Sequence, residues 1–363
     1  MVMTRFRKTP PESICILRLS ALGDVSNVVP VVKRLQQVWP DTRIVWVTGK
    51  AEHSLLKGLA GVEFIVYDKA TGFKGMRAIW QQLSETRFDL MLHMQAALRA
   101  SVLSVGIKAK VKLGFDKARA KDWQWLFTNQ KITPREKSHV VEGFYDFLAA
   151  LEIAPDQPSD MEWELPVSAE AIEEAKKKCP CNRYVVISPC SSQRARNFRN
   201  WTLEGYVAVV EYLYREHGIK AVITGGNREI EHQYGREIME QATTPVLNLV
   251  AQTSLQGLVA LIQRASLVIA PDSGPVHFAN AVNTPVIGLF ATSNVHRTGP
   301  YKWQQWVVNK YPEAAQTYMN RSVDQLSWGE RVRHPHAMEL IETDDVIQKI
   351  DQLMADTQKQ SDL

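Results

Sequence analysis

The chain has 363 residues, of which 45% are hydrophobic and 23% are charged, and its formal net charge at pH 7 is only +4. No apolar run approaches the roughly 20 residues that span a membrane. The apolar stretch after the basic N-terminus is too short and too polar for a signal peptide. These features predict a cytoplasmic globular protein of two domains, at roughly 150 residues per domain, and they do not indicate a nucleic-acid partner.

The first half of the chain alternates apolar runs with segments of helical apolar spacing. The strands that this pattern predicts are 13–19, 42–48, 62–67, 88–93 and 110–114. The helices that it predicts are 25–39, 51–59, 74–85, 96–104 and 140–151. Such alternation predicts a parallel sheet covered by helices on both faces.

A proline- and acid-rich stretch at 154–166 marks the expected end of the first domain, and a second alternation follows it. The helices predicted there are 169–178, 203–217, 229–241, 255–264 and 276–281. The strands are 184–188, 220–224, 246–249, 265–270 and 285–290. We therefore expect an α/β protein with two doubly wound domains, 1–166 and 167–342, followed by an amphipathic helix and polar tail at 343–363.

The turn after the strand at 265–270 is a candidate phosphate site. It reads Pro271-Asp272-Ser273-Gly274-Pro275, and Pro275 suits the first turn of a helix. Free backbone N–H groups at such a helix start attract anions. His277 is expected either to hydrogen-bond near the phosphate or to be an ordinary interior histidine. No cluster of histidines or carboxylates accompanies it, so we expect no metal.

Hydroxyl and guanidinium groups follow the strand at 184–188. Ser191 and Ser192 come first, and Arg194, Arg196 and Arg199 follow. Arginines next to hydroxyl-rich backbone at a strand end suit a diphosphate. A solvated basic loop fits the same residues equally well.

A glycine pair, Gly225 and Gly226, ends the strand at 220–224. It allows a ligand to approach the backbone closely, and Glu229 or Glu231 would then accept a ribose hydroxyl. Both acids also suit the positive end of a helix dipole. The pattern is not Gly-x-Gly-x-x-Gly, which disfavours a dinucleotide oxidoreductase.

Asp24 follows the short loop Ser20-Ala-Leu-Gly23 at the carboxyl end of the first strand. A carboxylate there can act as a general base on a sugar hydroxyl. It can also simply cap the next helix, and spacing alone favours the cap.

A basic run between Lys108 and Lys121 suggests an anionic partner, with Lys112, Arg119 and Lys121 as candidate contacts. The alternating lysines also suit the exposed face of an edge strand. Trp123 and Trp125 beside the run suit a lipid headgroup layer, although buried tryptophan is the commoner case.

These motifs together resemble the lipopolysaccharide heptosyltransferases of glycosyltransferase family 9. The resemblance rests on Arg18-Leu-Ser-Ala-Leu-Gly-Asp24, on Pro271–Ala279 with Asn283-Thr-Pro-Val286, and on Arg297-Thr-Gly-Pro-Tyr301. It implies the GT-B fold, in which two Rossmann-like domains face a central cleft and the C-terminal helix packs back on the N-terminal domain. Cys190-Ser-Ser and 331–336 look closer to the heptosyltransferase I branch.

The resemblance implies an inverting transfer of heptose from ADP-L-glycero-β-D-manno-heptose to a Kdo sugar of lipid A, at the cytoplasmic face of the inner membrane and without a metal. Asp24 matches the family's proposed catalytic base. The implied donor-binding residues are Ser191, Ser192, Arg199, Glu231, Asp272, Ser273, Gly274 and His277. The implied acceptor-binding residues are Lys112, Arg119, Lys121 and His139. The loop before Trp201 is longer than in the family, so either Arg196 or Arg199 could match the family's basic residue. The resemblance does not explain the extra length at 311–335.

Two alternatives remain at this stage. One is a GT-B transferase or sugar-nucleotide epimerase that uses another nucleotide sugar. The other is a nucleotide-binding assembly partner without catalysis, which the presence of Asp24 in the first loop disfavours.

Overall fold

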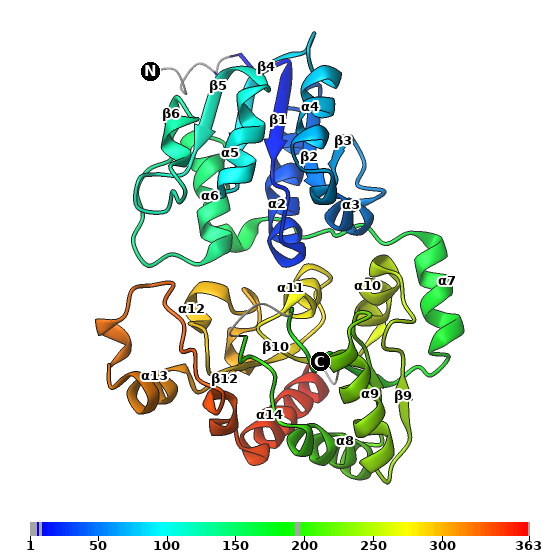
Figure 1. The fold of residues 1–363 in the computed structure, drawn as a ribbon. Coiled ribbons are helices and arrows are strands. Elements are labelled where there is room, and N and C mark those ends of the chain that lie inside the picture. The colour runs from blue at the N-terminus through cyan, green and yellow to red at the C-terminus, as the bar shows by residue number, and fades with distance from the viewer. Residues whose placement is uncertain (1–5, 7–8, 193–196, 362–363) are drawn as a thin grey trace. The chain divides into compact units, whose positions relative to one another are not determined.

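A computed structural model describes residues 6, 9–192 and 197–361. The chain divides into two compact units, Met1–Pro166 and Val167–Leu363. Each unit is a six-stranded sheet, and every strand pair within it is parallel. Helices flank both sheets (Figure 1). Arg194 and Arg196 lie outside the described residues.

The sheet of the first unit has the strand order β3-β2-β1-β4-β5-β6. Its strands are β1 (Ser13–Leu17), β2 (Arg43–Gly49), β3 (Val62–Tyr67), β4 (Arg87–His93), β5 (Lys108–Gly114) and β6 (Gln130–Lys131). Its helices are α2 (Leu22–Val38), α3 (Lys50–Leu56), α4 (Gly72–Gln82), α5 (Leu98–Val105) and α6 (Val140–Ala150). The predicted elements are confirmed to within a few residues, and only the short polar strand β6 was not foreseen.

The sheet of the second unit has the order β12-β11-β10-β7-β8-β9. Its strands are β7 (Tyr184–Ile187), β8 (Lys220–Ile223), β9 (Val246–Asn248), β10 (Leu267–Pro271), β11 (Val286–Phe290) and β12 (Val308–Asn309). Its helices are α7 (Ala169–Lys178), α8 (Leu203–His217), α9 (Glu229–Gln241), α10 (Leu255–Arg264), α11 (Gly274–Ala281), α12 (Val295–Thr298), α13 (Tyr311–Met319) and α14 (Thr343–Ser361). Sequence periodicity did not predict β12, α12 or α13, which are short.

The strand order places β1 and β4 side by side in the first sheet, and β7 and β10 side by side in the second. In each pair the chain continues from parallel strands into loops at the same edge of the sheet. Ligands of doubly wound sheets bind outside this carboxyl edge, where the strand order reverses. The fold therefore brings the Asp24 loop together with the end of β4, and the Ser191 loop together with Asp272.

The C-terminal helix α14 belongs to the second unit, and its expected packing on the first domain stays a prediction. Its apolar residues Val346, Ile350 and Leu353 are buried in the same core as α8 and β11. Figure 1 shows α14 in red beside α8. Burying this stripe inside the second unit removes its apolar surface from water there. Among the described residues, no helix is long and apolar enough to cross a membrane.

Candidate active site

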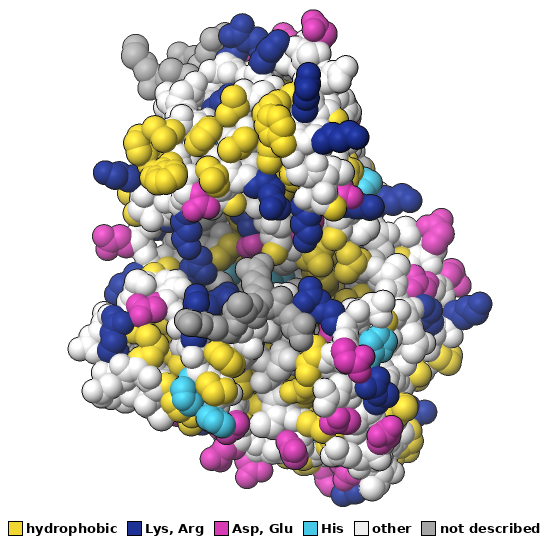
Figure 2. Space-filling view, viewed as in Figure 1, with side chains coloured by type: hydrophobic (Ala, Val, Ile, Leu, Met, Phe, Trp, Pro, Cys, Tyr) yellow, Lys and Arg dark blue, Asp and Glu magenta, His cyan; other side chains and the backbone are white. Residues whose placement is uncertain are grey.

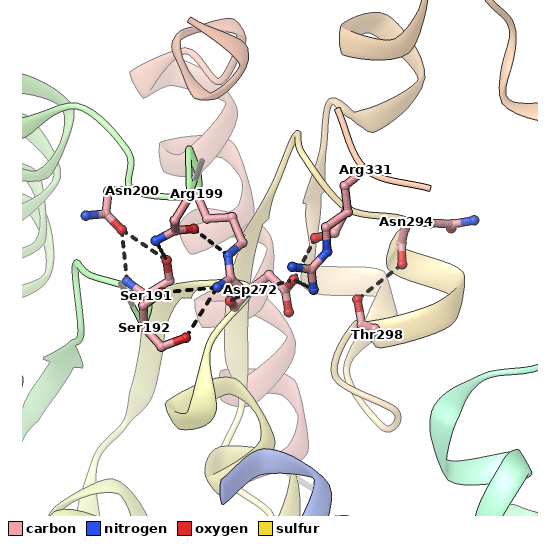
Figure 3. A network of polar contacts seen from close by, with 10 residues as sticks. Ser191, Ser192, Arg199, Asn200, Asp272, Asn294, Thr298 and Arg331 are labelled. Carbon is pink, nitrogen blue, oxygen red and sulfur yellow. Dashed lines mark hydrogen bonds and ion pairs between the residues drawn. The ribbon is translucent and has the colours of Figure 1, made fainter. Parts of the chain in front are cut away.

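Asp272 is the centre of a polar network at the end of β10 (Figure 3). Its side chain is 8% exposed, and one carboxylate oxygen, Oδ2, accepts a hydrogen bond of 2.8 Å from Ser293 Oγ. Arg199 donates from Nη1 to the Asp272 carbonyl at 2.8 Å and lies 3.4 Å from Oδ2. Arg331 approaches the same oxygen from Nη2 at 3.5 Å. One carboxylate thus holds two guanidinium groups beside the start of α11.

Arg331 and Ser293 are site residues that sequence reasoning missed. They face each other in an isolated antiparallel bridge, and the Tyr311 hydroxyl donates to the carbonyl of Glu330 at 2.9 Å. The bridge and this hydrogen bond fix the segment that carries Arg331 beside Asp272. The extra length at 311–335 therefore has a role, because it returns a second arginine to the network. Nothing in the local sequence pattern marks Arg331 as a neighbour of Asp272.

The N-terminus of α11 has the features of an anion site. Ser273 is its N-cap residue but makes no side-chain capping hydrogen bond, and its Oγ is buried with no partner among the described residues. Pro275 occupies the first turn, as predicted. Helix N–H groups, an unused hydroxyl and two nearby guanidinium groups all favour a phosphate. His277, half-buried, lies in the same helix.

The Ser191 loop joins this network through its side chains. Ser191 is 4% exposed and donates from its backbone N to Asn200 Oδ1 at 2.9 Å, while Asn197 Nδ2 donates to its Oγ at 2.7 Å. Ser192 is exposed, and its Oγ accepts from Arg199 Nη2 at 3.4 Å. Arg199 therefore links Ser192 to Asp272. The two asparagines that order the loop were not predicted.

The structure distinguishes Glu231 from Glu229. Glu231 Oε1 accepts a hydrogen bond of 2.7 Å from the backbone N of Gly226. A Cβ on Gly226 would lie 3.0 Å from Glu231 Oε2, so the glycine leaves room for the carboxylate over the turn. Glu229 is 81% exposed and pairs with Arg236 at 3.0 Å. Of the two acids, Glu231 is the one that lies over the glycine turn.

The Glu231 turn and the Ser191 loop lie next to each other. Ser188 and Thr224, at the ends of β7 and β8, share a hydroxyl hydrogen bond of 2.6 Å. The pKa of the Cys190 thiol is raised to about 12, first by burial and then by the negative charge of Glu231. The second unit thus gathers its predicted donor residues along one edge of its sheet.

In the first unit, Asp24 lies in the first turn of α2. Its Oδ2 accepts from the backbone N of Ala21 at 3.2 Å and pairs with Arg18 Nη2 at 2.5 Å. Its side chain is 33% exposed. Asp24 therefore caps the helix and also keeps carboxylate surface accessible, while its role as a general base stays a prediction.

The loop before Asp24 is held by the end of β4. Gln95 Oε1 accepts from the backbone N of Leu19 at 2.5 Å and of Ser20 at 3.2 Å. Arg18 donates from Nη1 to the carbonyl of Met94 at 2.5 Å. Glu52, which sequence reasoning missed, lies near this loop: burial raises the pKa of its carboxyl group, and the charge of Asp24 raises it further. Asp24 thus belongs to a supported polar cluster.

Comparison with known proteins identifies the family. Residues 76–326 match the family described as "Glycosyltransferase family 9 (heptosyltransferase)". The lipopolysaccharide core heptosyltransferase OpsX of Haemophilus influenzae is 37% identical over 94% of this chain and 97% of its own length. The chain belongs to glycosyltransferase family 9. It is therefore a glycosyltransferase, as the resemblance implied.

Solved structures of this family share the fold. The family 9 glycosyltransferase of Veillonella parvula matches with a TM-score of 0.78 at 19% identity, covering 95% of this chain and 98% of its own. The heptosyltransferase WaaC of E. coli, solved with ADP, matches with a TM-score of 0.69 at 18% identity, covering 94% and 97%. These matches confirm the GT-B fold expected for this family 9 enzyme.

The residues predicted to bind the acceptor do not form one free basic face in this glycosyltransferase. Arg119 pairs with Asp116 and Asp146 and donates to the carbonyl of Thr133 at 2.8 Å. His139, which is buried, accepts from the backbone N of Val141 at 3.1 Å and so caps α6. These contacts stabilise the first unit. The local sequence could not reveal them, because folding brings the partners together.

Lys112 and Lys121 differ in their surroundings. Lys112 is half-buried and donates to the carbonyl of Ser104 at 2.6 Å, and burial lowers the pKa of its ammonium group. Its strand, β5, lies between β4 and β6, so it is not the edge strand considered above. Lys121 is exposed. Of the four predicted acceptor contacts, Lys121 alone has an exposed side chain.

Metal ligands do not gather in the part of the family 9 chain that the structure describes. Within it, no group of three or more His, Cys, Asp or Glu residues is placed to hold an ion. Metal independence stays a prediction, with a direct test below.

Proposed function

We propose that this family 9 enzyme transfers L-glycero-D-manno-heptose, with inversion, from ADP-heptose to a Kdo sugar of lipid A in the lipopolysaccharide inner core. The observation that carries the proposal is the cluster of Arg199, Arg331 and Ser273 Oγ at the start of α11, a hydroxyl that has no partner in the described part of the chain. The names of two relatives support it, since OpsX is a lipopolysaccharide core heptosyltransferase and WaaC was solved with ADP.

The cluster suits the diphosphate of the donor because that group gains negative charge as it leaves. When the bond between the anomeric carbon and the diphosphate oxygen breaks, the electron pair stays on ADP. Arg199, Arg331 and the N–H groups of α11 are charged or dipolar donors fixed before the reaction, so they stabilise that charge without reorganising. Asp272 orients both arginines and does not itself contact the reacting atoms.

Asp24 is the proposed general base. Its carboxylate takes the proton of the acceptor Kdo hydroxyl while that oxygen attacks the anomeric carbon from the face opposite to the departing diphosphate. A single displacement of this kind inverts the anomeric configuration. Arg18 pairs with Asp24 at 2.5 Å and orients its carboxylate.

Glu231 is proposed to bind the ribose of the nucleotide. Its carboxylate lies over the Gly225-Gly226 turn next to the Ser191 loop, and carboxylate oxygens accept from sugar hydroxyls. Glu231→Gln should weaken ADP binding by roughly tenfold, since one hydrogen bond to a charged group is lost. The matched control is Glu229→Gln, on the exposed side of the same turn. Calorimetric titration with ADP separates them, and equal losses in both variants would contradict the assignment.

The acceptor is attached to a lipid, so we propose that the enzyme works as a peripheral protein at the cytoplasmic face of the inner membrane. The heptosyltransferase I branch, which adds the first heptose, is the proposed specificity. Lys121 remains a proposed contact for the acidic groups of the acceptor, whereas Lys112, Arg119 and His139 have the structural contacts described above.

The decisive experiment incubates the purified protein with ADP-heptose and Kdo-lipid A and follows the acceptor by mass spectrometry. Addition of one heptose supports the proposal, and parallel acceptors with one Kdo, two Kdo units or a phosphorylated Kdo define the specificity. A melting-temperature series with ADP, UDP and GDP tests the donor, because ADP alone should stabilise the protein. No transfer to any Kdo acceptor, or stabilisation by UDP or GDP instead, would overturn the assignment.

A further inference from the structure

Helix α5 buries polar residues and exposes apolar ones. Ser101 and Ser104 are 0% exposed, whereas Leu98 and Val105 are 46% and 61% exposed. Leu98 and Val105 lie seven residues apart on one helix face, and half-buried Val102 between them packs against the core. The apolar stripe of a helix on a soluble sheet normally faces the core. In α5 the side toward the core carries Ala100 and Leu103 together with the two serines. Leu98 and Val105 therefore form an additional apolar surface that faces outward.

The loop after β5 extends the apolar stripe at the N-terminal end of α5. Trp123, Trp125 and Leu126 are 65%, 42% and 62% exposed. The loop is tied to α5 because Asp122 accepts a hydrogen bond from the backbone N of Leu98 at 3.1 Å. Exposed apolar side chains from two separate segments therefore lie next to each other.

The exposed loop is rigidly anchored. Gln124 lies between the two tryptophans and is 0% exposed, and it donates from Nε2 to the carbonyl of His93 at 2.7 Å. Trp123 itself has a left-handed backbone with φ of 57°, a conformation that costs free energy for a residue with a side chain. Because Gln124 between them is buried and hydrogen-bonded, the tryptophans on either side of it face outward, and their exposure is a feature of the folded loop.

Helix α4 extends the stripe at the other end of α5. The Trp80 indole packs on Gly106 and donates from Nε1 to the carbonyl of Leu103 at 2.8 Å. Phe73, 64% exposed, contacts Trp80 edge to face at 5.5 Å between ring centroids. We call this continuous surface the α5 face. Its exposed residues are Phe73, Leu98, Val105, Trp123, Trp125 and Leu126.

Figure 2 shows apolar side chains gathered over α5 on this side of the first unit. Large exposed apolar residues are scarce elsewhere: in the described part of the chain the only others are Val66 and Met239. An apolar patch of this kind on a soluble domain marks a contact surface.

The charges around the α5 face are positive. Arg99, Lys117, Lys121 and Lys131 are exposed, and none of them pairs with an acid within the described residues. The Lys131 ammonium lies 5.9 Å from the centre of the Trp125 ring, a cation–π contact at the margin of the face. The acid beside them, Asp122, is used to bond Leu98. The partner of this face is therefore expected to be apolar and anionic together.

We propose that the α5 face docks the first unit on the surface of an anionic lipid bilayer. Tryptophan inserts at the boundary between headgroups and acyl chains, while lysine and arginine beside it contact anionic headgroups. An acidic protein partner would satisfy the charges, but exposed indoles flanked by exposed lysine and arginine match the composition of interfacial membrane anchors. The proposal rests on the proposed function only in that a lipid-linked acceptor gives docking a purpose.

The test is sedimentation of the full-length protein with vesicles of phosphatidylglycerol and phosphatidylethanolamine. Binding should be strong at low salt, and it should fall about tenfold or more in the double variant Trp123→Ser/Leu126→Ser. Lys117→Gln with Lys131→Gln should weaken binding and its dependence on salt. Met239→Ser, which removes an exposed apolar residue of the second unit, is the matched control and should bind like the wild type.

Three readouts separate docking from other roles. The double variant should keep its melting temperature, its stabilisation by ADP and its turnover with a lipid-free Kdo acceptor. Unchanged vesicle binding in that variant would overturn the proposal, and so would equal binding of the wild type to neutral phosphatidylcholine vesicles. Loss of a dimer in sedimentation-velocity runs without loss of vesicle binding would assign the face to self-association instead. Failure of heptose transfer would leave all these vesicle measurements intact.

Discussion

Each unit has an aspartate that pairs with arginine at the carboxyl edge of its sheet. The two aspartates differ in how many groups they contact and in how exposed their side chains are. Asp24 pairs with one arginine, Arg18, and its side chain is 33% exposed. Asp272 contacts two arginines and a serine hydroxyl, and its side chain is 8% exposed. The first carboxylate keeps surface for another partner, whereas the second is largely buried and one of its oxygens carries three contacts.

This difference fits the two different roles that we propose for one residue type. A base must reach a substrate proton within hydrogen-bond distance, which the accessible Asp24 can do. A carboxylate that contacts two guanidinium groups, as Asp272 does, is placed to position those groups. Similar location on two similar domains therefore does not imply similar function.

Substituting the accessible carboxylate should have the largest effect. Asp24→Asn removes the proton acceptor but keeps the size of the side chain, so kcat should fall by roughly 10²–10⁴-fold. ADP affinity should stay near that of the wild type, because the donor residues lie in the second unit. Steady-state kinetics with an ADP titration measure both quantities, and turnover like that of the wild type would remove Asp24 from the role of base.

Acidification should destabilise the protein at His93, the last residue of β4, whose end holds the loop before Asp24. Burial lowers the pKa of His93 to about 4, and its Nδ1 lies 2.8 Å from Gln124 Nε2, a donor. The unfolded chain, with an ordinary pKa near 6.5, binds more protons between about pH 6.5 and 4, so stability falls as pH falls through this window. The expected loss is about 3 kcal/mol.

Urea unfolding of the wild type and of His93→Gln across this pH range measures that loss. The variant should lack the part of the pH dependence that belongs to His93, and its curve should be flatter. Two parallel curves would show that His93 does not titrate differently in the folded protein.

The two arginines of the second pair should contribute unequally to nucleotide binding. Arg199→Gln removes a guanidinium that is 11% exposed and should raise the Kd for ADP by roughly 10–100-fold, the value of a charge-assisted hydrogen bond. Arg331→Gln removes one that is 37% exposed and should raise it by roughly 3–10-fold. Calorimetry gives the ranking, and a reversed order would mean that Arg331 is the main phosphate ligand.

Chelation should have the smallest effect. If the two arginines and the α11 N-terminus provide the positive charge that the diphosphate needs, EDTA should leave the rate of transfer unchanged. A rate that falls with EDTA and returns with added Mg²⁺ would contradict this part of the proposal.

The sequence predicted the layers of the fold well, because long apolar runs and helical spacing depend on nearby residues. It also identified Asp272 and Ser273 through a short motif between a strand and a helix. It did not identify Arg331. This residue contacts Asp272 from 59 positions further along the chain, and the elements between them are short and irregular.

Other residues escaped for a related reason. Arg119 and His139 looked like free cationic groups because their acidic and backbone partners are brought to them only by folding. The sequence also left open whether Trp123 is buried or exposed. Its exposure depends on a tertiary contact, the hydrogen bond from Gln124 to the His93 carbonyl. The local sequence pattern predicts which helix or strand a residue belongs to. Tertiary contacts decide which hydrogen-bond and ion-pair partners its polar atoms have.

The return of the chain to Asp272 near residue 331 has a consequence for protein synthesis. The polar network at Asp272 includes Arg331, and the core of the same unit includes Val346, Ile350 and Leu353 of α14. A ribosome must therefore have made nearly the whole polypeptide before the second unit can complete this network and its core. Prematurely terminated chains would carry Asp24 and a finished first unit, yet the second unit would lack part of its core.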